Sequence, residues 1–312
     1  MLRVVTAAVV LFLIVPSTNG FAKPPIPLTD CETITQRGNY ILENDLVFTS
    51  GMGNGSCLVI DSSHVNVDLN GQAITCIYSP ELPIPCGEEF APLAGIGIDI
   101  EADHVSIAGG NVDGFTVGIF GEADHISATG LSLTTGIGIV LDDASHSSFT
   151  DITYAGGDQQ YHASNGPVLS VSGGGHNSFT TVSGSSGGGF FEMPGIIVEN
   201  SSNNVIDGAN IDCTAEAAAG PGILLTQDSD NNFVTNNNIF VLFGNGIEVD
   251  LNSDYNVIQN NTVETETTEP GFFAMLDQNP DCGSDVWTDN VFTNEFAFLT
   301  GQASASPVDC IH

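Results

Sequence analysis

Histidine and carboxylate side chains recur at fixed positions in this sequence, and both types can bind metals or transfer protons. The stretch ADHVSIAGGNV (102–112) is followed by the similar stretch ADHISATGLSL (123–133). Aligned on their histidines, these stretches belong to a run of five copies that all carry histidine: His64, His104, His125, His146 and His176. Such a column could coordinate a transition metal, or it could simply occupy a repeated turn.

The neighbouring residues favour the turn. Each histidine follows Ser, Asp or Gly, which are common turn formers. In later copies the histidine position is taken by Asn203, Asn231, Tyr255 and Ser284. Strands of neighbouring copies would lie about 4.8 Å apart, whereas two zinc–nitrogen bonds of about 2.1 Å span less. We therefore expect stacked imidazoles at a repeated corner, with metal binding as the alternative.

Carboxylates recur three residues before the histidine position. Stacked carboxylates repel one another, so their pKa rises or a cation lies between them. Oxygen ligands favour Ca²⁺, for which Glu101, Glu122 and Asp143 are the candidate ligands. The alternative is a solvated acidic stripe, and no cofactor is required. The full column is Asp61, Glu101, Glu122, Asp143, Gly173, Asn200, Asp228, Asn252 and Asp281.

The same acidic face offers catalytic and binding candidates. Hydrolysis of a glycosidic bond needs two suitably spaced carboxyl groups, and Asp142, Asp143 and Glu122 are the candidates here. Aromatic rings beside a polar groove stack on sugar faces. Tyr161, Phe190 and Phe191 lie in insertions between the repeats and are the candidate ligand-binding residues.

The repeat itself predicts the fold. Nine copies share an apolar residue three positions after the histidine position, and long helical patterns are missing from all of them. Short strands joined by Gly, Asn, Ser and Thr favour an all-β, right-handed parallel β-helix, a single-stranded solenoid of about nine rungs. The apolar column is Val67, Ile107, Ala128, Phe149, Phe179, Ile206, Val234, Ile258 and Trp287.

Two further features follow from this arrangement. Asparagines are expected to stack in the second turn of each rung, at Asn111, Asn210, Asn238, Asn261 and Asn290. The long insertions are expected along one edge, beside the outer face of the first strand. They span residues 76–95, 155–167, 184–194, 213–221 and 264–271.

The segments CETITQRGNYILENDL, CLVIDSSHVNVDLNGQAI, NNVIDGANI, NNFVTNNNIF and YNVIQNNTV resemble rungs of the pectate-lyase-like right-handed β-helix proteins. That class includes carbohydrate-binding and sugar-hydrolase domains, so the resemblance implies a polysaccharide or other glycan partner. Its lyases use Lys or Arg, which the repeats here lack, so such a lyase is not expected. Its polygalacturonase-like hydrolases use aspartates, a histidine and an Arg-x-Lys motif, and Arg-x-Lys is absent here.

Composition limits the partners and the compartment. The chain has 38 acidic and 3 basic residues, a net charge of −35, which repels nucleic acid. Residues 1–22 resemble a signal peptide whose apolar run is too short to span a membrane, and no later segment is long enough either. The protein is therefore expected to be secreted, extracellular or periplasmic. Disulfides are expected there, with Cys31–Cys57, Cys76–Cys86 and Cys282–Cys310 as pairs and Cys213 left over.

The expected organisation is a signal peptide (1–22), an N-terminal cap (23–45) and a β-helix domain (46–312) whose C-terminal end a disulfide closes. The expected function is binding of an extracellular glycan or another surface interaction. The alternatives are a glycoside hydrolase that uses paired carboxylates and an inert acidic or cation-binding spike.

Overall fold

The computed structural model describes residues 23–49, 55–77, 86, 94–156, 166–186, 193–214, 220–242, 244–266, 272–279, 283–294 and 311. Within these ranges every regular element is a β-strand, and every strand pairing is parallel. No helix in the described part is long and apolar enough to cross a membrane. Residues 1–22, the expected signal peptide, lie outside it.

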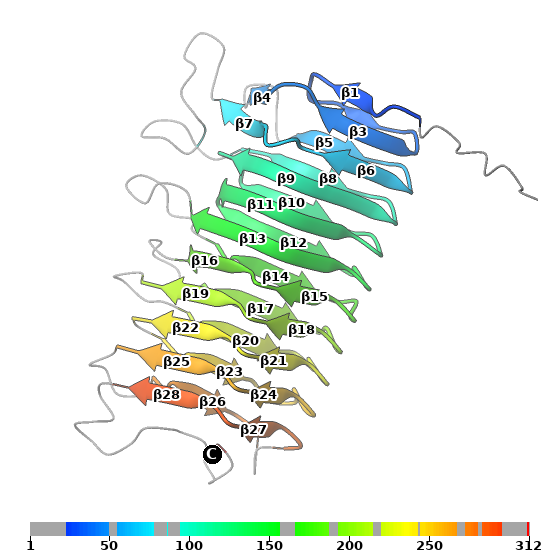
Figure 1. The fold of residues 1–312 in the computed structure, drawn as a ribbon. Coiled ribbons are helices and arrows are strands. Elements are labelled where there is room, and N and C mark those ends of the chain that lie inside the picture. Colours follow the sequence, from blue (N-terminus) through cyan, green and yellow to red (C-terminus); the bar gives the residue numbers. More distant parts are fainter. Residues whose placement is uncertain are drawn as a thin grey trace, which may run out of the picture.

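The strands wind into a stack of coils that contact one another only along the stack (Figure 1). Each coil contributes one strand to a sheet that we call the first sheet. Its members are β2 (Thr33–Ile34), β5 (Ser56–Ile60), β8 (Ile96–Ile100), β10 (Val117–Gly121), β12 (Ile137–Asp142), β14 (Leu169–Ser172), β17 (Ile196–Glu199), β20 (Ile223–Thr226), β23 (Ile247–Val249) and β26 (Met275–Asp277).

The remaining strands form one continuous sheet of 18 strands that bends into two faces. The second face, here the second sheet, holds β1 (Ile26–Leu28), β3 (Gly38–Leu42), β6 (Val65–Asp68), β15 (Ser178–Thr180), β18 (Val205–Asp207), β21 (Phe233–Thr235), β24 (Val257–Gln259) and β27 (Val286–Thr288). The third holds β4 (Leu46–Thr49), β7 (Ala73–Ile77), β16 (Ser183–Ser186), β19 (Asn210–Cys213), β22 (Asn238–Val241), β25 (Thr262–Thr265) and β28 (Val291–Asn294).

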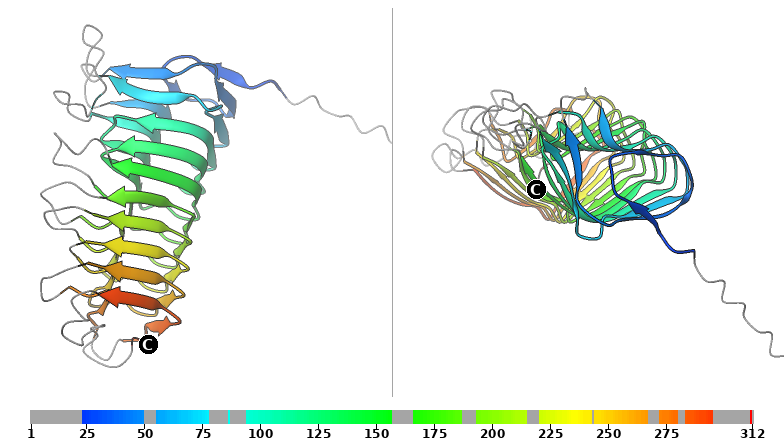
Figure 2. Two further views of the ribbon diagram at one scale, coloured as in Figure 1. Left: turned by 60° about the vertical axis from the view of Figure 1, so that its left-hand side comes forward. Right: turned by 90° about the horizontal axis from the view of Figure 1, so that it is seen from above.

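Three longer strands run through both of these faces without a break, which joins the second and third sheets. They are β9 (Val105–Asp113), β11 (Ser127–Thr135) and β13 (Ser148–Gly156). Viewed down the stack, each coil is a flattened loop around an interior (Figure 2, right). The parallel β-helix expected from the repeat is therefore confirmed.

The first sheet has ten strands, so the structure has one coil more than the nine copies found in the sequence. The additional coil is the first one. Gly38 pairs with Val65, which puts Arg37 in register with His64. This coil was not recognised as a copy of the repeat because arginine occupies the histidine position. Residues 26–42 of the expected cap segment form β1, β2 and β3, which pair with each other or with later coils.

The predicted interior column is confirmed by the strand register. Phe149 pairs with Ala128 on one side and with Phe179 on the other, and the column continues to Ile258 and Trp287. The rings of Phe149 and Phe179 stack with centroids 5.6 Å apart. Trp287 is 4% exposed and its indole N–H donates to Asp277 Oδ2 at 3.0 Å, so the expected core role of Trp287 is confirmed.

Glycine lets the third and first sheets approach closely at their shared corner. A Cβ placed on Gly222 would lie 2.4 Å from Ile239 Cγ2 and 2.7 Å from the backbone oxygen of Gly246. Such contacts force neighbouring backbone to move. The same position is glycine in several other coils, at Gly97, Gly118, Gly138, Gly195 and Gly246.

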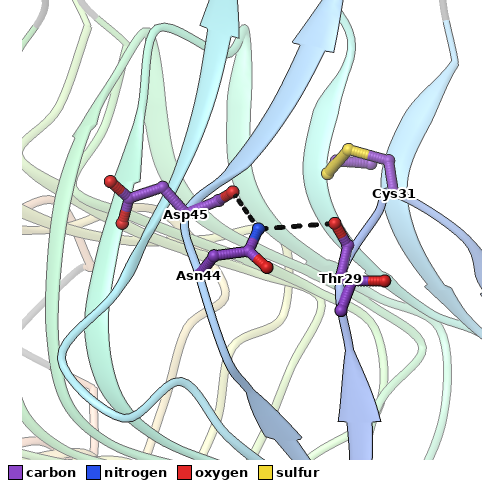
Figure 3. The surroundings of a disulfide bond; sticks show 5 residues. Thr29, Cys31, Asn44 and Asp45 are labelled. Atoms are coloured by element: carbon purple, nitrogen blue, oxygen red, sulfur yellow. Dashed lines mark hydrogen bonds between the residues drawn. A yellow bond between two sulfur atoms is a disulfide. The ribbon is translucent and has the colours of Figure 1, made fainter.

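Two disulfides cross-link the N-terminal coils. Cys31 bonds Cys57 and Cys76 bonds Cys86, so both predicted pairings are confirmed. Beside Cys31, the amide of Asn44 donates to the carbonyl oxygens of Thr29 and Asp45 at 3.4 and 2.7 Å (Figure 3). Disulfides of this kind indicate an oxidising compartment outside the cytoplasm.

The remaining cysteines are not part of these two disulfides. The third expected pair, Cys282 and Cys310, lies outside the described residues. Cys213 is buried in β19, on the interior side of the third sheet.

Asparagines form ladders, but not in the single column that was predicted. Asn261 donates to Asn290 Oδ1 and accepts from Asn237, whereas Asn238 donates to Asn210 on the exposed face one residue further along. The prediction that Asn238 and Asn210 share the column of Asn261 is therefore wrong. In the buried column Asn237 and Asn261 each accept the backbone N–H of the preceding coil through Oδ1, which explains why asparagine occupies it.

A second buried ladder lies one residue after the histidine position. Asn177, Asn204, Asn232 and Asn256 each accept the backbone N–H of the preceding coil at 2.9 to 3.1 Å. In this way a corner with no strand pairing keeps its buried amides hydrogen-bonded. In the earlier coils Val65, Val105 and Ile126 take the same place.

Asp285 ends this second ladder in the position of an asparagine. It accepts the backbone N–H of Asn256 at 2.7 Å and the side-chain amide of Asn279 at 3.2 Å. Burial, with a smaller contribution from the negative charge of Asp277, raises the pKa of Asp285 to about 7. A carboxyl with an ordinary pKa of 3.8 is thereby kept protonated under mildly acidic conditions.

The stability of the wild type should fall as the pH rises, and we expect Asp285→Asn to abolish this fall. Between pH values of about 4 and 7 the unfolded chain has released this proton and the folded chain still holds it, so the free energy of unfolding falls with increasing pH. Urea unfolding at several pH values checks this, with Glu264→Gln on an exposed face as control. The difference between Asp285→Asn and the wild type should grow from pH 4 to 7. A difference that stays constant with pH would contradict the assignment.

Candidate functional site

The histidines occupy the left-handed backbone conformation expected of a turn residue. Their φ angles lie between 57° and 62°, and Asn203, Asn231 and Tyr255 continue the same geometry. The imidazole rings form one exposed stack with successive centroids 4.8, 4.6, 5.3 and 5.1 Å apart. The expected column of imidazoles on a repeated corner is thus present.

The aspartate before the histidine explains the repeated phrase ADH. Asp103 Oδ1 accepts the backbone N–H of Asp124 at 3.0 Å, and Asp124 Oδ1 accepts that of Ser145 at 2.8 Å. Each aspartate therefore caps the same corner of the next coil. Asp–His is a structural pair in this setting, since the first residue bonds the next coil and the second makes the turn.

From the fourth position onward the acidic column differs from its predicted membership. Gly121 pairs with Leu141, so Glu122 lies beside Asp142 rather than beside Asp143. Asp143 is an extra residue after the strand with φ of 53°, in the left-handed region. The prediction that Asp143 directly neighbours Glu122 is therefore wrong. By register the column runs Asp61, Glu101, Glu122, Asp142, Ser172, Glu199 and Thr226.

Mutual repulsion in this column is visible at Glu101. Desolvation, followed by the charges of Asp99, Asp61 and Glu122, raises the pKa of Glu101 above its ordinary value. Asp99 also accepts a hydrogen bond from Ser56 Oγ at 2.7 Å. Among the residues that the structure describes, no three His, Cys, Asp or Glu side chains are grouped so that they could hold a metal ion. The Ca²⁺ site at Glu101, Glu122 and Asp143 stays a prediction.

A groove of 680 Å³ lies on the outer face of the first sheet, over β12, β14, β17, β20 and β23. Outward side chains of successive strands form its floor: Val140 pairs with Ser170, Ser170 with Ile197, and Ile197 with Leu224. Prolines form one wall, at Pro167, Pro194 and Pro221. The groove therefore presents rigid, apolar surface over several coils.

The predicted insertions fall largely outside the described residues, so only the strands that they join can be given. Residues 157–165, 187–192, 215–219 and 267–271 each connect a strand of the third sheet to the next strand of the first sheet. Tyr161, Phe190 and Phe191 fall in these stretches, so the predicted ligand-binding aromatics lie outside the described residues. Phe272 is the aromatic residue that is described in the lining of the groove.

Polar groups at one end of the groove are held in fixed orientations. Glu248 Oε2 accepts from Asn245 Nδ2 at 2.7 Å and Oε1 accepts from Gln278 Nε2 at 2.5 Å. Asn245 is itself oriented because its Oδ1 accepts the backbone N–H of Phe273 at 2.8 Å. A carboxylate with one donor on each oxygen retains lone pairs for a ligand.

The groove lining includes none of the three predicted catalytic residues. Glu122, Asp142 and Asp143 are exposed, and Asp142 follows the lining residue Val140 by two positions on the same face of β12. The carboxylates in the lining are Glu199 and Glu248, and we did not single out either from the sequence.

A signal for the groove was present in the sequence. Pro167, Pro194 and Pro221 recur at the same phase as GPV, MPG and GPG, which gives three consecutive coils a proline at one position.

Ten parallel coils with a groove on the outside of one sheet define a right-handed parallel β-helix protein. The family described as right handed beta helix region matches residues 117–297, which is more than half of the chain. The protein belongs to this family.

Solved structures have the same fold at low sequence identity. The Azotobacter vinelandii mannuronan C-5 epimerase AlgE4 A-module has a TM-score of 0.54 at 12% identity, over 83% of this chain and 80% of that one. A mutant of the periplasmic alginate epimerase AlgG has a TM-score of 0.50 at 12% identity, over 84% of this chain and 76% of that one. The enzymatically active domain of bacteriophage CBA120 tailspike protein 2 has 0.46 at 15% identity.

The lengths of these proteins differ from that of this chain. In the tailspike comparison the aligned region spans 90% of this chain but 40% of the tailspike domain. None of the curated proteins compared with the chain matches its sequence.

Proposed function

We propose that this protein binds an extracellular polysaccharide along the groove on the first sheet. The observation that carries the proposal is the shape and chemistry of the groove: an apolar floor and proline wall over several coils, with carboxylates and an amide at its edges. Sugars present apolar C–H faces and hydroxyl edges, and sites for them combine apolar surface with a few placed polar groups. Two β-helix proteins of similar structure are epimerases of mannuronan and alginate, which are polysaccharides.

The compartment belongs to the same proposal. The resemblance of residues 1–22 to a signal peptide and the two disulfides support secretion, either to the periplasm or to the cell exterior. A glycan partner is available in both places.

A glycan array followed by calorimetry tests the binding. Leu224→Ser should weaken the affinity for a retained glycan about tenfold, because burying such a side chain contributes on the order of 1.5 kcal/mol. Val257→Ser, on the outward face of the second sheet and outside the groove lining, should leave the affinity unchanged. If the array retained no glycan, or if both variants lost affinity equally, the protein would be better described as an inert acidic spike.

Hydrolysis of the bound glycan is the second proposal, and the strand register favours it. Glu122 and Asp142 stand on neighbouring strands, about 4.8 Å apart along the stack. Retaining glycosidases hold their two carboxyl groups about 5 to 5.5 Å apart. Asp142 would serve as nucleophile and Glu122 as acid, while Asp143 lies beyond the strand and would assist from the turn.

Reducing-sugar release from mixed polysaccharides measures this activity. Asp142→Asn should lower turnover at least a hundredfold if the carboxylate is the nucleophile, whereas Asp254→Asn, at a corner of a distant coil, should not change it. Unchanged turnover in Asp142→Asn, or none in the wild type, would leave binding as the function.

A further inference from the structure

Among the described residues, no lysine or arginine lines the groove beside its carboxylates. Besides Arg3, which is not described, the chain has two basic residues, Lys23 and Arg37. Lys23 precedes β1 and Arg37 precedes β3 at the N-terminal end of the stack, whereas the groove begins at β12, several coils further along. In the described part of the chain, therefore, neither lysine nor arginine supplies a positive charge beside these carboxylates, and a cationic ligand can do so.

Glu199 is the carboxylate best placed to receive such a charge. It ends β17 on the outer face, two residues after the floor residue Ile197. Its side chain has neither a hydrogen bond nor an ion pair with any residue in the described part of the chain, whereas its backbone oxygen accepts from Gly173. Its neighbours in register, Ser172 and Thr226, are uncharged. A carboxylate beside an apolar floor gains more from a cation than one in bulk water, because the surrounding dielectric is lower.

Glu248 offers a second carboxylate from the same groove. It lies two strands beyond Glu199 in the first sheet, which is about 10 Å along the stack. The amides of Asn245 and Gln278 fix its orientation. The two carboxylates are thus spaced along the floor rather than concentrated at one point, which suits a polymer with repeated charges better than a single ion.

We propose that the groove selects a polysaccharide that bears protonated amino groups, with Glu199 and Glu248 each receiving an ammonium group while the floor and the proline wall cover the sugar rings. This inference rests on the proposed polysaccharide binding and adds the class of sugar. A uronate polymer carries the wrong charge for this groove, and a fully acetylated amino sugar lacks the charge that the two glutamates complement.

Calorimetry with three oligosaccharides of equal length tests the selection in the full-length protein. At about pH 6, below the ordinary pKa of an amine, a glucosamine hexamer should bind at least tenfold more tightly than an N-acetylglucosamine hexamer. A galacturonate hexamer should not bind. Glu199→Gln should lower the affinity for the glucosamine hexamer about tenfold, because a charge-assisted hydrogen bond is lost, and should leave the affinity for the acetylated hexamer unchanged.

A matched variant separates a built site from the general attraction of an acidic protein. Glu264→Gln removes an exposed carboxylate on the third sheet, outside the groove lining, and should leave the affinity for glucosamine unchanged. An equal loss in Glu264→Gln and Glu199→Gln would overturn the inference, as would equal binding of the two glucosamine-based hexamers.

Two further outcomes discriminate the proposals. A lysine hexamer that binds as tightly as the glucosamine hexamer, with the same dependence on Glu199, would replace the sugar by a basic polypeptide and overturn the inference. Binding of the acetylated hexamer alone would end the amino-sugar selection but leave polysaccharide binding intact. If Leu224→Ser weakened none of the sugars, the proposed function itself would fail.

Discussion

Replacing Phe149 with alanine should lower the free energy of unfolding by about 3 to 5 kcal/mol, as is typical of a buried phenylalanine. The ring is fully buried, and it stacks on the ring of Phe179 in the next coil. On the other side its register partner is the small side chain of Ala128. Neither neighbour can fill the cavity, because both are held in place by continuous strand pairing.

Urea unfolding of Phe149→Ala and of the control Phe240→Ala measures this effect. Phe240 lies on the outward side of β22 and is half-buried, so its loss should cost less than about 1.5 kcal/mol. Equal losses in the two variants would show that the interior column is not the main source of stability. Circular dichroism of both variants checks that the remaining coils are still formed.

Asn232→Ala should destabilise the protein by on the order of 2 to 4 kcal/mol, since several buried groups lose their partners at once. Its Oδ1 accepts both the backbone N–H and the side-chain amide of Asn204, at 2.9 and 3.0 Å. Its own amide donates to the Ser201 carbonyl and to Asn256 Oδ1, each at 3.2 Å. Asn204 and Asn256 are themselves completely buried, so water cannot readily replace these bonds.

Asn238→Ala is the matched control, because Asn238 donates a comparable hydrogen bond to Asn210 on an exposed face. Its loss should cost less than about 1 kcal/mol, since solvent satisfies the freed groups. Thermal unfolding of the two variants under identical conditions gives the comparison. The ladder would lose its assigned role if Asn232→Ala were no more harmful than Asn238→Ala.

The coil architecture could be predicted from the sequence because a repeated phase has a simple physical meaning. An apolar residue three positions after the histidine position recurs from Val67 to Trp287, and parallel stacking places such residues directly above one another. The turn position of the histidines could be predicted for a similar reason. A position that accepts His, Asn and Tyr after a turn former indicates a backbone constraint rather than a shared ligand.

Positions that shift by one residue could not be predicted in the same way. The extra residue at Asp143 changes which carboxylate neighbours Glu122, and a fixed offset from the histidine does not reveal it. The same problem assigned Asn238 instead of Asn237 to the buried ladder. The first coil was missed because Arg37 replaces the histidine at its corner.

The groove was harder still to predict, because it depends on which outward residues of different strands share a wall. Glu199 and Glu248 lie in neighbouring outward columns and at different offsets from the corner. A search for acidic residues at a single position of the repeat therefore does not find both glutamates together. The prolines could be recognised in the sequence, since they recur at a constant spacing before three successive strands of the first sheet.

The equal spacing of Pro167, Pro194 and Pro221 has a consequence for how such proteins diversify. Among the described residues each coil bonds to the coil above and the coil below, so a tandem duplication of one 27-residue unit would insert a complete layer while keeping the contacts within the others. The binding surface would then lengthen in increments of about 4.8 Å. Ligands of different length could be matched by gene duplication alone, with no redesign of the existing contacts.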